Sequence, residues 1–194
     1  MILAAVVAGG IGVASAASPE PANALRPPSS FGDIKDEHAR AIALFQEAAK
    51  VITSARCLNC HPASDTPTQT DAMRPHQPRV VRGADGHGAA GIRCQNCHQD
   101  ENSDATNTPG NPEWRLAPAS MAWQGKSLGE ICALMKDPGR NGNRDLAMIV
   151  RHVSEDALVG WAWKPGGDRA PAPGTQTEFG ALMKAWAELG ADCP

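Results

Sequence analysis

The chain has 194 residues, with 18 Lys and Arg against 21 Asp and Glu, which gives a net charge of −3. This balance provides neither the basic surface that nucleic acids require nor an acidic tail, so it argues against nucleic acid as a partner. With three Phe, five Trp and no Tyr beside 19 Gly and 16 Pro, the core is thin, and a non-protein group is expected to fill part of the interior.

The first sixteen residues, 1–16, carry no charge and end in Ala14-Ser15-Ala16, which is typical of a secretory signal peptide. A second candidate cleavage site ends at Ala24. The alternative is a membrane anchor, but the apolar stretch is too short and too rich in Gly and Ala to span a bilayer well. No other segment is apolar enough to cross a membrane. We therefore expect a periplasmic mature chain without a membrane span.

Residues 17–32 are rich in Pro, Ser and Ala and are expected to form a flexible lead-in to a single domain over 33–194. Apolar residues at three- and four-residue spacings predict an amphipathic helix from about 34 to 52. Similar stripes predict three later helices: one opened by the capping-box pattern at Ser127, one after Asn143 and one from about Thr177. Strand-like stretches are missing, so the chain is expected to be mainly α with long loops and little or no sheet.

The sequence Cys57-Leu-Asn-Cys60-His61 is followed by a second motif of the same spacing, Cys94-Gln-Asn-Cys97-His98. Cys-x-x-Cys-His is the spacing that attaches a c-type haem. The two thiols reach the two vinyl groups of one porphyrin, and the adjacent imidazole binds the iron. We therefore expect two haem c groups, held by these four cysteines with His61 and His98 as iron ligands, inside a cytochrome c-like arrangement of short helices and loops.

Zinc is the main alternative, because paired Cys-x-x-Cys motifs also build tetrahedral thiolate sites. Against zinc, a His follows each second Cys directly, and the segment between the motifs is longer than the usual zinc-ribbon spacing. A thioredoxin-like redox pair is also disfavoured, since neither motif lies in a strand-helix-strand context.

Two cysteines remain outside the motifs, Cys132 and Cys193. An even remainder in an oxidising compartment favours a disulfide. It would tie the helix after Ser127 to the C-terminal end, and the alternative is two buried free thiols.

The sixth ligand of each iron would come from a further His or a Met. His76 ranks first because prolines on either side stiffen its backbone. His152 ranks second, on the flank of a predicted helix, with a solvent-facing role as the alternative. His38 on the first helix and Met121 in a Pro-containing segment are held in reserve. Bis-His ligation gives lower potentials than His/Met ligation, and the sequence leaves this choice open.

Several indoles in loops near Pro or Gly are expected to form pocket walls: Trp114, Trp123, Trp161 and Trp163. Beyond the two motifs, four stretches resemble bacterial isoquinoline 1-oxidoreductase-associated cytochrome subunits: 56–62, 114–123, 136–142 and 158–163. The resemblance implies a small di-haem cytochrome that accepts electrons from a partner oxidoreductase.

The expected function is periplasmic electron transfer to or from a redox protein partner. Two alternatives remain: a di-haem enzyme, such as a peroxidase or an oxidase of a small anion, and a haem-based sensor. Both require one iron with an open coordination position, whereas the histidines of this chain are numerous enough to saturate both irons.

Overall fold

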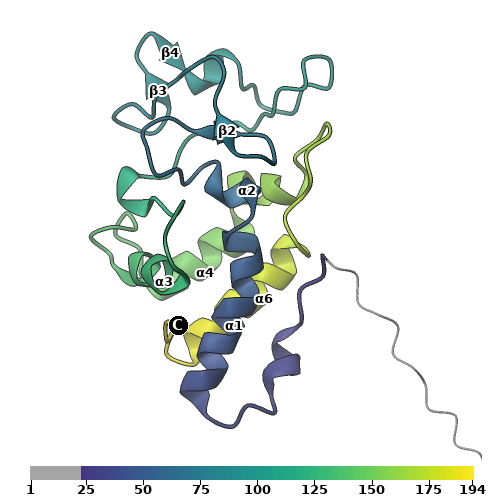
Figure 1. Ribbon diagram of the computed structural model, residues 1–194, viewed down its shortest axis with the longest axis vertical. Helices are drawn as coiled ribbons and strands as arrows, with labels where there is room; N and C mark the ends of the chain where they lie inside the picture. The colour runs from purple at the N-terminus through teal and green to yellow at the C-terminus, as the bar shows by residue number, and fades with distance from the viewer. Residues whose placement is uncertain (1–22) are drawn as a thin grey trace, which may run out of the picture.

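The computed structural model describes residues 23–194, and Figure 1 shows a helical part below a part built largely of loops. The predicted signal peptide lies outside the described residues. The longer helices are α1 (Glu37–Ile52), α3 (Leu128–Lys136), α4 (Leu146–Glu155) and α6 (Gln176–Glu188). The shorter elements are the helical turns α2 (Ala55–Leu58) and α5 (Ala157–Gly160) and the 3-10 turns η1 (Pro28–Phe31), η2 (Cys94–Asn96), η3 (Ala119–Met121) and η4 (Trp161–Trp163).

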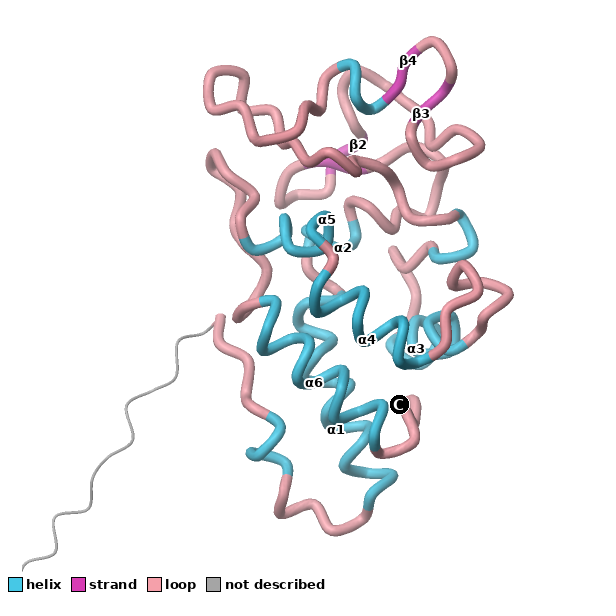
Figure 2. The backbone as a smooth tube through the Cα atoms, turned by 180° about the vertical axis from the view of Figure 1, so that it is seen from behind, coloured by secondary structure: helices cyan, strands magenta, loops and turns pink. Residues whose placement is uncertain are grey.

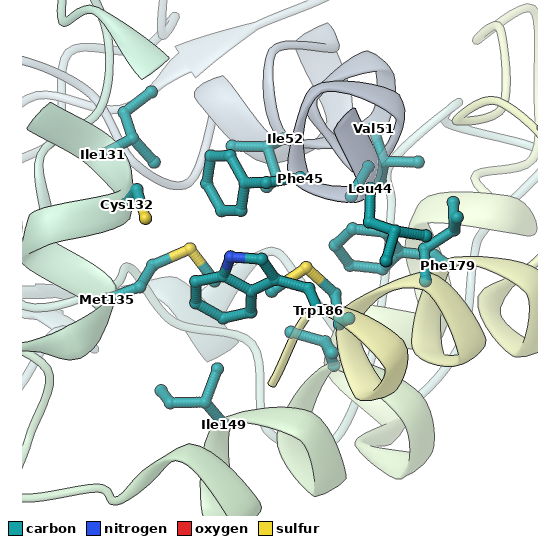
Figure 3. Packing of buried hydrophobic residues seen from close by; sticks show 14 of the residues in the cluster. Leu44, Phe45, Val51, Ile52, Ile131, Cys132, Met135, Ile149, Phe179 and Trp186 are labelled. Atoms are coloured by element: carbon teal, nitrogen blue, oxygen red, sulfur yellow. The ribbon is translucent and has the colours of Figure 1, made fainter. Parts of the chain in front are cut away.

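Helices α1 and α6 lie side by side and supply a large share of the hydrophobic core (Figure 2). The ring centres of Phe45 on α1 and Trp186 on α6 are 5.2 Å apart, and both residues are fully buried. Figure 3 shows Trp186 at the centre of this cluster, with Met135 and Ile149 of α3 and α4 beside it. The apolar stripes recognised in the sequence match the buried faces of α3, α4 and α6. On α1 the buried face also includes Leu44 and Val51 and leaves out His38.

Helix boundaries follow from side-chain caps. The Ser127 side chain accepts a hydrogen bond from the Glu130 backbone N–H, and the Glu130 carboxylate accepts from the Ser127 backbone N–H, so the predicted capping box is confirmed. Asp36 and Asp145 cap α1 and α4 in the same way, through one side-chain oxygen each.

The predicted disulfide between Cys132 and Cys193 is confirmed, with the two Cα atoms 5.6 Å apart. It joins α3 to the end of the chain beyond α6. On the other side of α6, Gly180 packs against Ser154 of α4, where a Cβ would lie 2.3 Å from the Ser154 hydroxyl oxygen. The absence of a side chain at this position lets α4 and α6 approach closely.

The segment 23–32 is folded against the helices, although the sequence analysis expected a flexible lead-in over 17–32. Leu25 and Phe31 are 4% and 2% exposed and belong to the core cluster. Arg26 forms an ion pair with the buried carboxylate of Glu47 on α1, at 2.9 Å. The composition of this segment gave no sign of these contacts, because only two of its residues are large and apolar.

The loop part, residues 59–126, contains four two-residue strands that form two antiparallel hairpins. Strand β1 (Thr68–Gln69) pairs with β2 (Arg74–Pro75), and β3 (Gly88–Ala89) pairs with β4 (Ile92–Arg93). The buried Arg82 holds the loops together: its guanidinium donates to the carbonyl oxygens of Ser64 and Ala117. Polar contacts to backbone thus replace the side-chain packing of the helical part.

The prediction of a mainly helical chain with little sheet is confirmed. Over residues 23–194 no helix is long and apolar enough to cross a membrane.

Candidate functional site

Both Cys-x-x-Cys-His motifs fold into a single helical turn. In the first, the backbone N–H groups of Cys60 and His61 donate to the carbonyl oxygen of Cys57, at 3.1 and 3.0 Å. In the second, Cys97 and His98 donate to the carbonyl oxygen of Cys94, at 3.1 and 2.9 Å. Residues three and four positions apart share one side of a helical turn, so each motif presents two thiols and one imidazole together.

The first motif lies beside a cavity of about 160 Å³ that borders the core, here called the helix cavity. Its lining contains Cys57, Cys60 and His61. It also contains His152 of α4 and Met121 of η3, two of the predicted distal ligands. Apolar side chains of α3, α4 and α6 form part of the remaining wall: Met135, Ile149, Val153 and Phe179.

The imidazole of His61 has a defined orientation and protonation. Its Nδ1 lies 2.7 Å from the backbone carbonyl oxygen of Met121, which can only accept, so Nδ1 carries the proton and Nε2 keeps its lone pair. The ring stacks on Trp123 with ring centres 3.5 Å apart and planes 7° from parallel. Burial lowers the pKa of His61 to about 4, so the ring is neutral at pH 7.

The second motif lies beside a larger cavity of about 730 Å³, here called the loop cavity. Its lining contains Cys94, Cys97 and His98, together with His76. Further parts of the wall come from the β1–β2 hairpin, from 56–60, from 77–81, from 92–93, from 106–116 and from 161–169. The volume lies within the range of about 300–1,000 Å³ that is usual for bound cofactors and ligands.

His98 repeats the arrangement of His61. Its Nδ1 lies 2.7 Å from the carbonyl oxygen of Pro109, which again leaves the Nε2 lone pair free. The ring stacks on Trp114 with centres 4.6 Å apart. Burial lowers the pKa of His98, and the nearby charges of His76 and Arg169 act in the same direction.

The structure brings His76 opposite His98, with ring centres 5.9 Å apart. A metal bonded to one nitrogen of each ring, at about 2 Å per bond, holds two imidazole centres about 6 Å apart. Nδ1 of His76 lies 2.8 Å from the carbonyl oxygen of Pro78, so its Nε2 also keeps the lone pair. One of the flanking prolines noted in the sequence, Pro78, therefore orients this ring through its backbone carbonyl oxygen.

His152 shares the helix cavity with His61 and is anchored by a carboxylate. Its Nδ1 lies 3.2 Å from Oδ2 of Asp156, which lies one turn later at the end of α4. Burial lowers the pKa of His152, and Asp156 opposes this shift. The side chain is 34% exposed, so His152 is partly buried and does not simply face solvent.

Two predicted residues lie away from the cavities. His38 is 65% exposed near the start of α1 and pairs with Asp192, at 2.9 Å. It lines neither cavity, so the structure gives no support for it as a ligand. Trp163 packs on Phe179 and donates to the carbonyl oxygen of Pro173, whereas Trp114, Trp123 and Trp161 do line the cavities.

The four motif cysteines are free thiols in the structure. Burial raises the pKa of Cys57 to about 12 and that of Cys60 to about 11. Redox-active Cys-x-x-Cys pairs require the opposite shift, because the thiolate is the reactive form. Among residues 23–194, no group of three His, Cys, Asp or Glu side chains is arranged to hold a metal ion.

The two cavities share one wall, to which Cys60, Leu116 and Trp161 contribute. Cys60 is close enough to Cys94 for the second thiol to contribute to its raised pKa. The backbone of 116–117 links the first motif to the loop before the second, since Ala117 N–H donates to the carbonyl oxygen of Cys60 and Leu116 N–H donates to that of Gly86. Groups bound in the two cavities would therefore be neighbours.

The linings of both cavities carry an excess of positive charge, although the whole chain is acidic. The cations in the two linings are all arginines: Arg56, Arg74, Arg93, Arg115, Arg144 and Arg169. The acids there are Asp71, Asp156 and Asp168. Arginine is the residue best suited to bind carboxylates in a planar, bidentate way. Bound groups with carboxylate side chains are therefore favoured.

Two donors in the wall of the helix cavity are buried without a hydrogen-bond partner in the described chain, Nε1 of Trp123 and Nε of Arg56. Buried donors without partners are uncommon in folded proteins and call for an explanation. An acceptor on a group bound in this cavity would supply one. The sequence assigned no role to Arg56. Its position directly before Cys57 was the only feature that could have pointed to a place in the site.

Comparison with protein-family models finds no match, and neither the curated proteins nor the solved structures include one that matches this chain.

Proposed function

We propose that this protein is a periplasmic di-haem c-type cytochrome that transfers electrons between redox partners. The observation that carries the proposal is the pairing of each Cys-x-x-Cys-His turn with a second histidine across one cavity. His61 is paired with His152, and His98 with His76. In this proposal, the two candidates that rank highest in the sequence would each supply the sixth ligand of one motif.

The donor residues at each motif fit a haem, and the loop cavity has the volume of a cofactor site. The helix cavity, at about 160 Å³, lies below that range, so a haem attached to Cys57 and Cys60 would need more room than this cavity encloses. Cys57 and Cys60, and likewise Cys94 and Cys97, would each add a thiol S–H across one vinyl group to form a thioether, with no leaving group. The bound iron would supply reversible one-electron chemistry. The porphyrin provides four ligands, so the protein needs to supply only one or two, and the paired histidines match that need.

The protein's own part is orientation and protection. The carbonyl oxygens of Met121 and Pro109 hold His61 and His98 in the tautomer whose Nε2 can bind a metal, which is the role of outer-shell acceptors at metal sites. Trp123 and Trp114 restrict rotation of these two rings by stacking. Carboxylates of the bound groups would meet the arginines of both linings.

The shared wall supports transfer between the centres, because Cys60 of the first motif lines the loop cavity together with Cys94 of the second. The predicted signal peptide and the resemblance to oxidoreductase-associated cytochromes support a periplasmic location and a partner oxidoreductase as electron donor. We offer both as parts of the proposal.

The test uses the haem-loaded protein, with absorption and electron paramagnetic resonance spectra in both oxidation states. We expect two low-spin, six-coordinate haems that do not react with carbon monoxide or peroxide. His76→Ala and His152→Ala should each open one iron, so that each variant binds carbon monoxide at one of its two haems. His38→Ala is the matched control and should behave as the wild type.

Met121 is the competing ligand in the helix cavity. If Met121→Leu removes a red charge-transfer band from the ferric spectrum while His152→Ala changes nothing, this haem has His/Met ligation. A high-spin haem in the wild type would instead favour the enzyme or sensor alternatives. Protein that carries no haem after expression with an attachment system would overturn the proposal as a whole.

A further inference from the structure

The side chain of Arg56 lies in the wall between the two cavities and lines both of them. This side chain is 2% exposed, in contrast to that of the other shared arginine, Arg115, which is 39% exposed. Its guanidinium carbon lies 5.8 Å from the ring centre of Trp161, which is also part of the shared wall. A buried positive charge therefore lies in the wall that the two candidate haem sites share.

The charge of Arg56 is only partly balanced by protein. Nη2 donates to Oδ1 of Asp71 at 2.5 Å, but that carboxylate is 49% exposed and also accepts a hydrogen bond from the backbone N–H of Ala170. Within the described chain, Nε of Arg56 is buried and has no partner. A guanidinium has five N–H donors, and burial without partners is costly. An anionic group in an adjoining cavity would complete its coordination.

We propose that Arg56 is a shared electrostatic element of the two redox centres, which contacts haem carboxylates and raises both reduction potentials together. This inference rests on the proposed function. A fixed positive charge disfavours the ferric state, which carries one more positive charge than the ferrous state, so it shifts each equilibrium toward reduction. Because Arg56 is buried, solvent and salt screen it weakly.

The same placement couples the two centres. Reduction of one haem would make its side of the wall more negative by one charge, so the guanidinium would be held more strongly there and would interact less with carboxylates on the other side. The two reduction steps would therefore depend on one another through one side chain. Arg93 lines only the loop cavity and pairs with Asp85, so it lacks this property.

The test is a potentiometric titration of the haem-loaded wild type and variants, after intact-mass analysis has counted the haems. Arg56→Gln should lower both midpoint potentials, and the shifts should persist at high salt. Arg115→Gln is the matched control: it removes the same charge from the same wall, but its smaller shifts should disappear with salt. Arg93→Gln should lower one midpoint only.

Asp71→Asn provides a second test if Arg56→Gln does not accumulate. Removal of this negative charge beside Arg56 should raise both midpoints. Arg56→Lys keeps the charge and should lie between the wild type and Arg56→Gln. The inference is overturned if two haems are present and either Arg56→Gln or Asp71→Asn moves one midpoint or none. Absence of haem would be a failure of the proposed function instead.

Discussion

The two motifs have the same local fold and very different surroundings. The turn at Cys57 borders the helix cavity, whose wall includes core residues of α3, α4 and α6. The turn at Cys94 borders a cavity several times larger, enclosed by hairpins and loops, and its second thiol, Cys97, is exposed. Five residues therefore determine the shape of each motif, and the rest of the chain determines how deeply it is buried.

This difference shows how the two parts reach stability. The helical part packs apolar side chains against one another, with Phe45 and Trp186 at its centre. The loop part has few buried apolar side chains and depends on contacts such as those of Arg82 with backbone carbonyls. We expect the bound group to supply the missing interior of the loop part, whereas in the helical part it completes an existing core.

The largest expected effect comes from removal of one pair of attachment thiols. The Cys94→Ser, Cys97→Ser double variant should keep one haem and a folded helical part. The Cys57→Ser, Cys60→Ser variant should also lose one haem, but its melting temperature should fall further because the loss leaves a void beside the core. Intact-mass analysis and circular dichroism measure both quantities. Equal losses of thermal stability would remove the distinction between the cavities.

Truncation of Trp186 to Ala should destabilise the helical part by about 3–5 kcal/mol, the usual cost of removing a large buried aromatic side chain. Denaturant unfolding of the haem-loaded protein provides the measurement. Val81, at the loop cavity, is 41% exposed, and Val81→Ala should change the unfolding free energy by less than about 0.5 kcal/mol. A comparable cost at both positions would show that the loop part has a packed core of its own.

The disulfide between Cys132 and Cys193 closes a loop with a sequence separation of 61 residues. The chain-entropy estimate for such a loop is about 4 kcal/mol, so the double variant to Ala should lose up to that amount. Neither cysteine lines a cavity, and the haem spectra should therefore remain those of the wild type. A change in either spectrum would show that the disulfide reaches the redox centres.

The smallest effect concerns Glu47, a carboxylate that is 3% exposed. Burial by itself raises the pKa of Glu47, but hydrogen bonds from Lys50 and Arg26 outweigh burial and hold it below its ordinary value of 4.5. Its stabilising contribution is therefore fully present above pH 4.5 and is lost as the pH falls through the lowered pKa. At pH 7, Glu47→Gln should cost about 1–3 kcal/mol.

The pH dependence of unfolding separates this ion pair from a simple packing effect. The wild type should lose stability below pH 4.5 more steeply than the Glu47→Gln variant. Glu188, an exposed partner of Lys184 at 3.8 Å, offers a matched control whose change to Gln should cost less than about 0.5 kcal/mol. Parallel pH profiles for wild type and Glu47→Gln would show that the lowered pKa contributes nothing to stability.

The sequence by itself determined the local features. The spacing of Cys57, Cys60 and His61 produces one helical turn through backbone hydrogen bonds, and apolar periodicity with the cap at Ser127 located the main helices. The count of cysteines was enough to predict the disulfide. The motif turns and the helices depend on residues within a few positions of one another. The disulfide followed because only Cys132 and Cys193 remain once the four motif cysteines are set aside.

Only the tertiary structure decided which histidine faces which motif. His76 and His38 precede the second and first motifs by similar distances in the chain, yet His76 lies 5.9 Å from His98 whereas His38 is exposed beside Asp192. Periodicity cannot distinguish them, because the distance between residues far apart in sequence depends on how helices and loops pack. The same holds for Arg56, whose burial between two cavities is a product of the assembled fold.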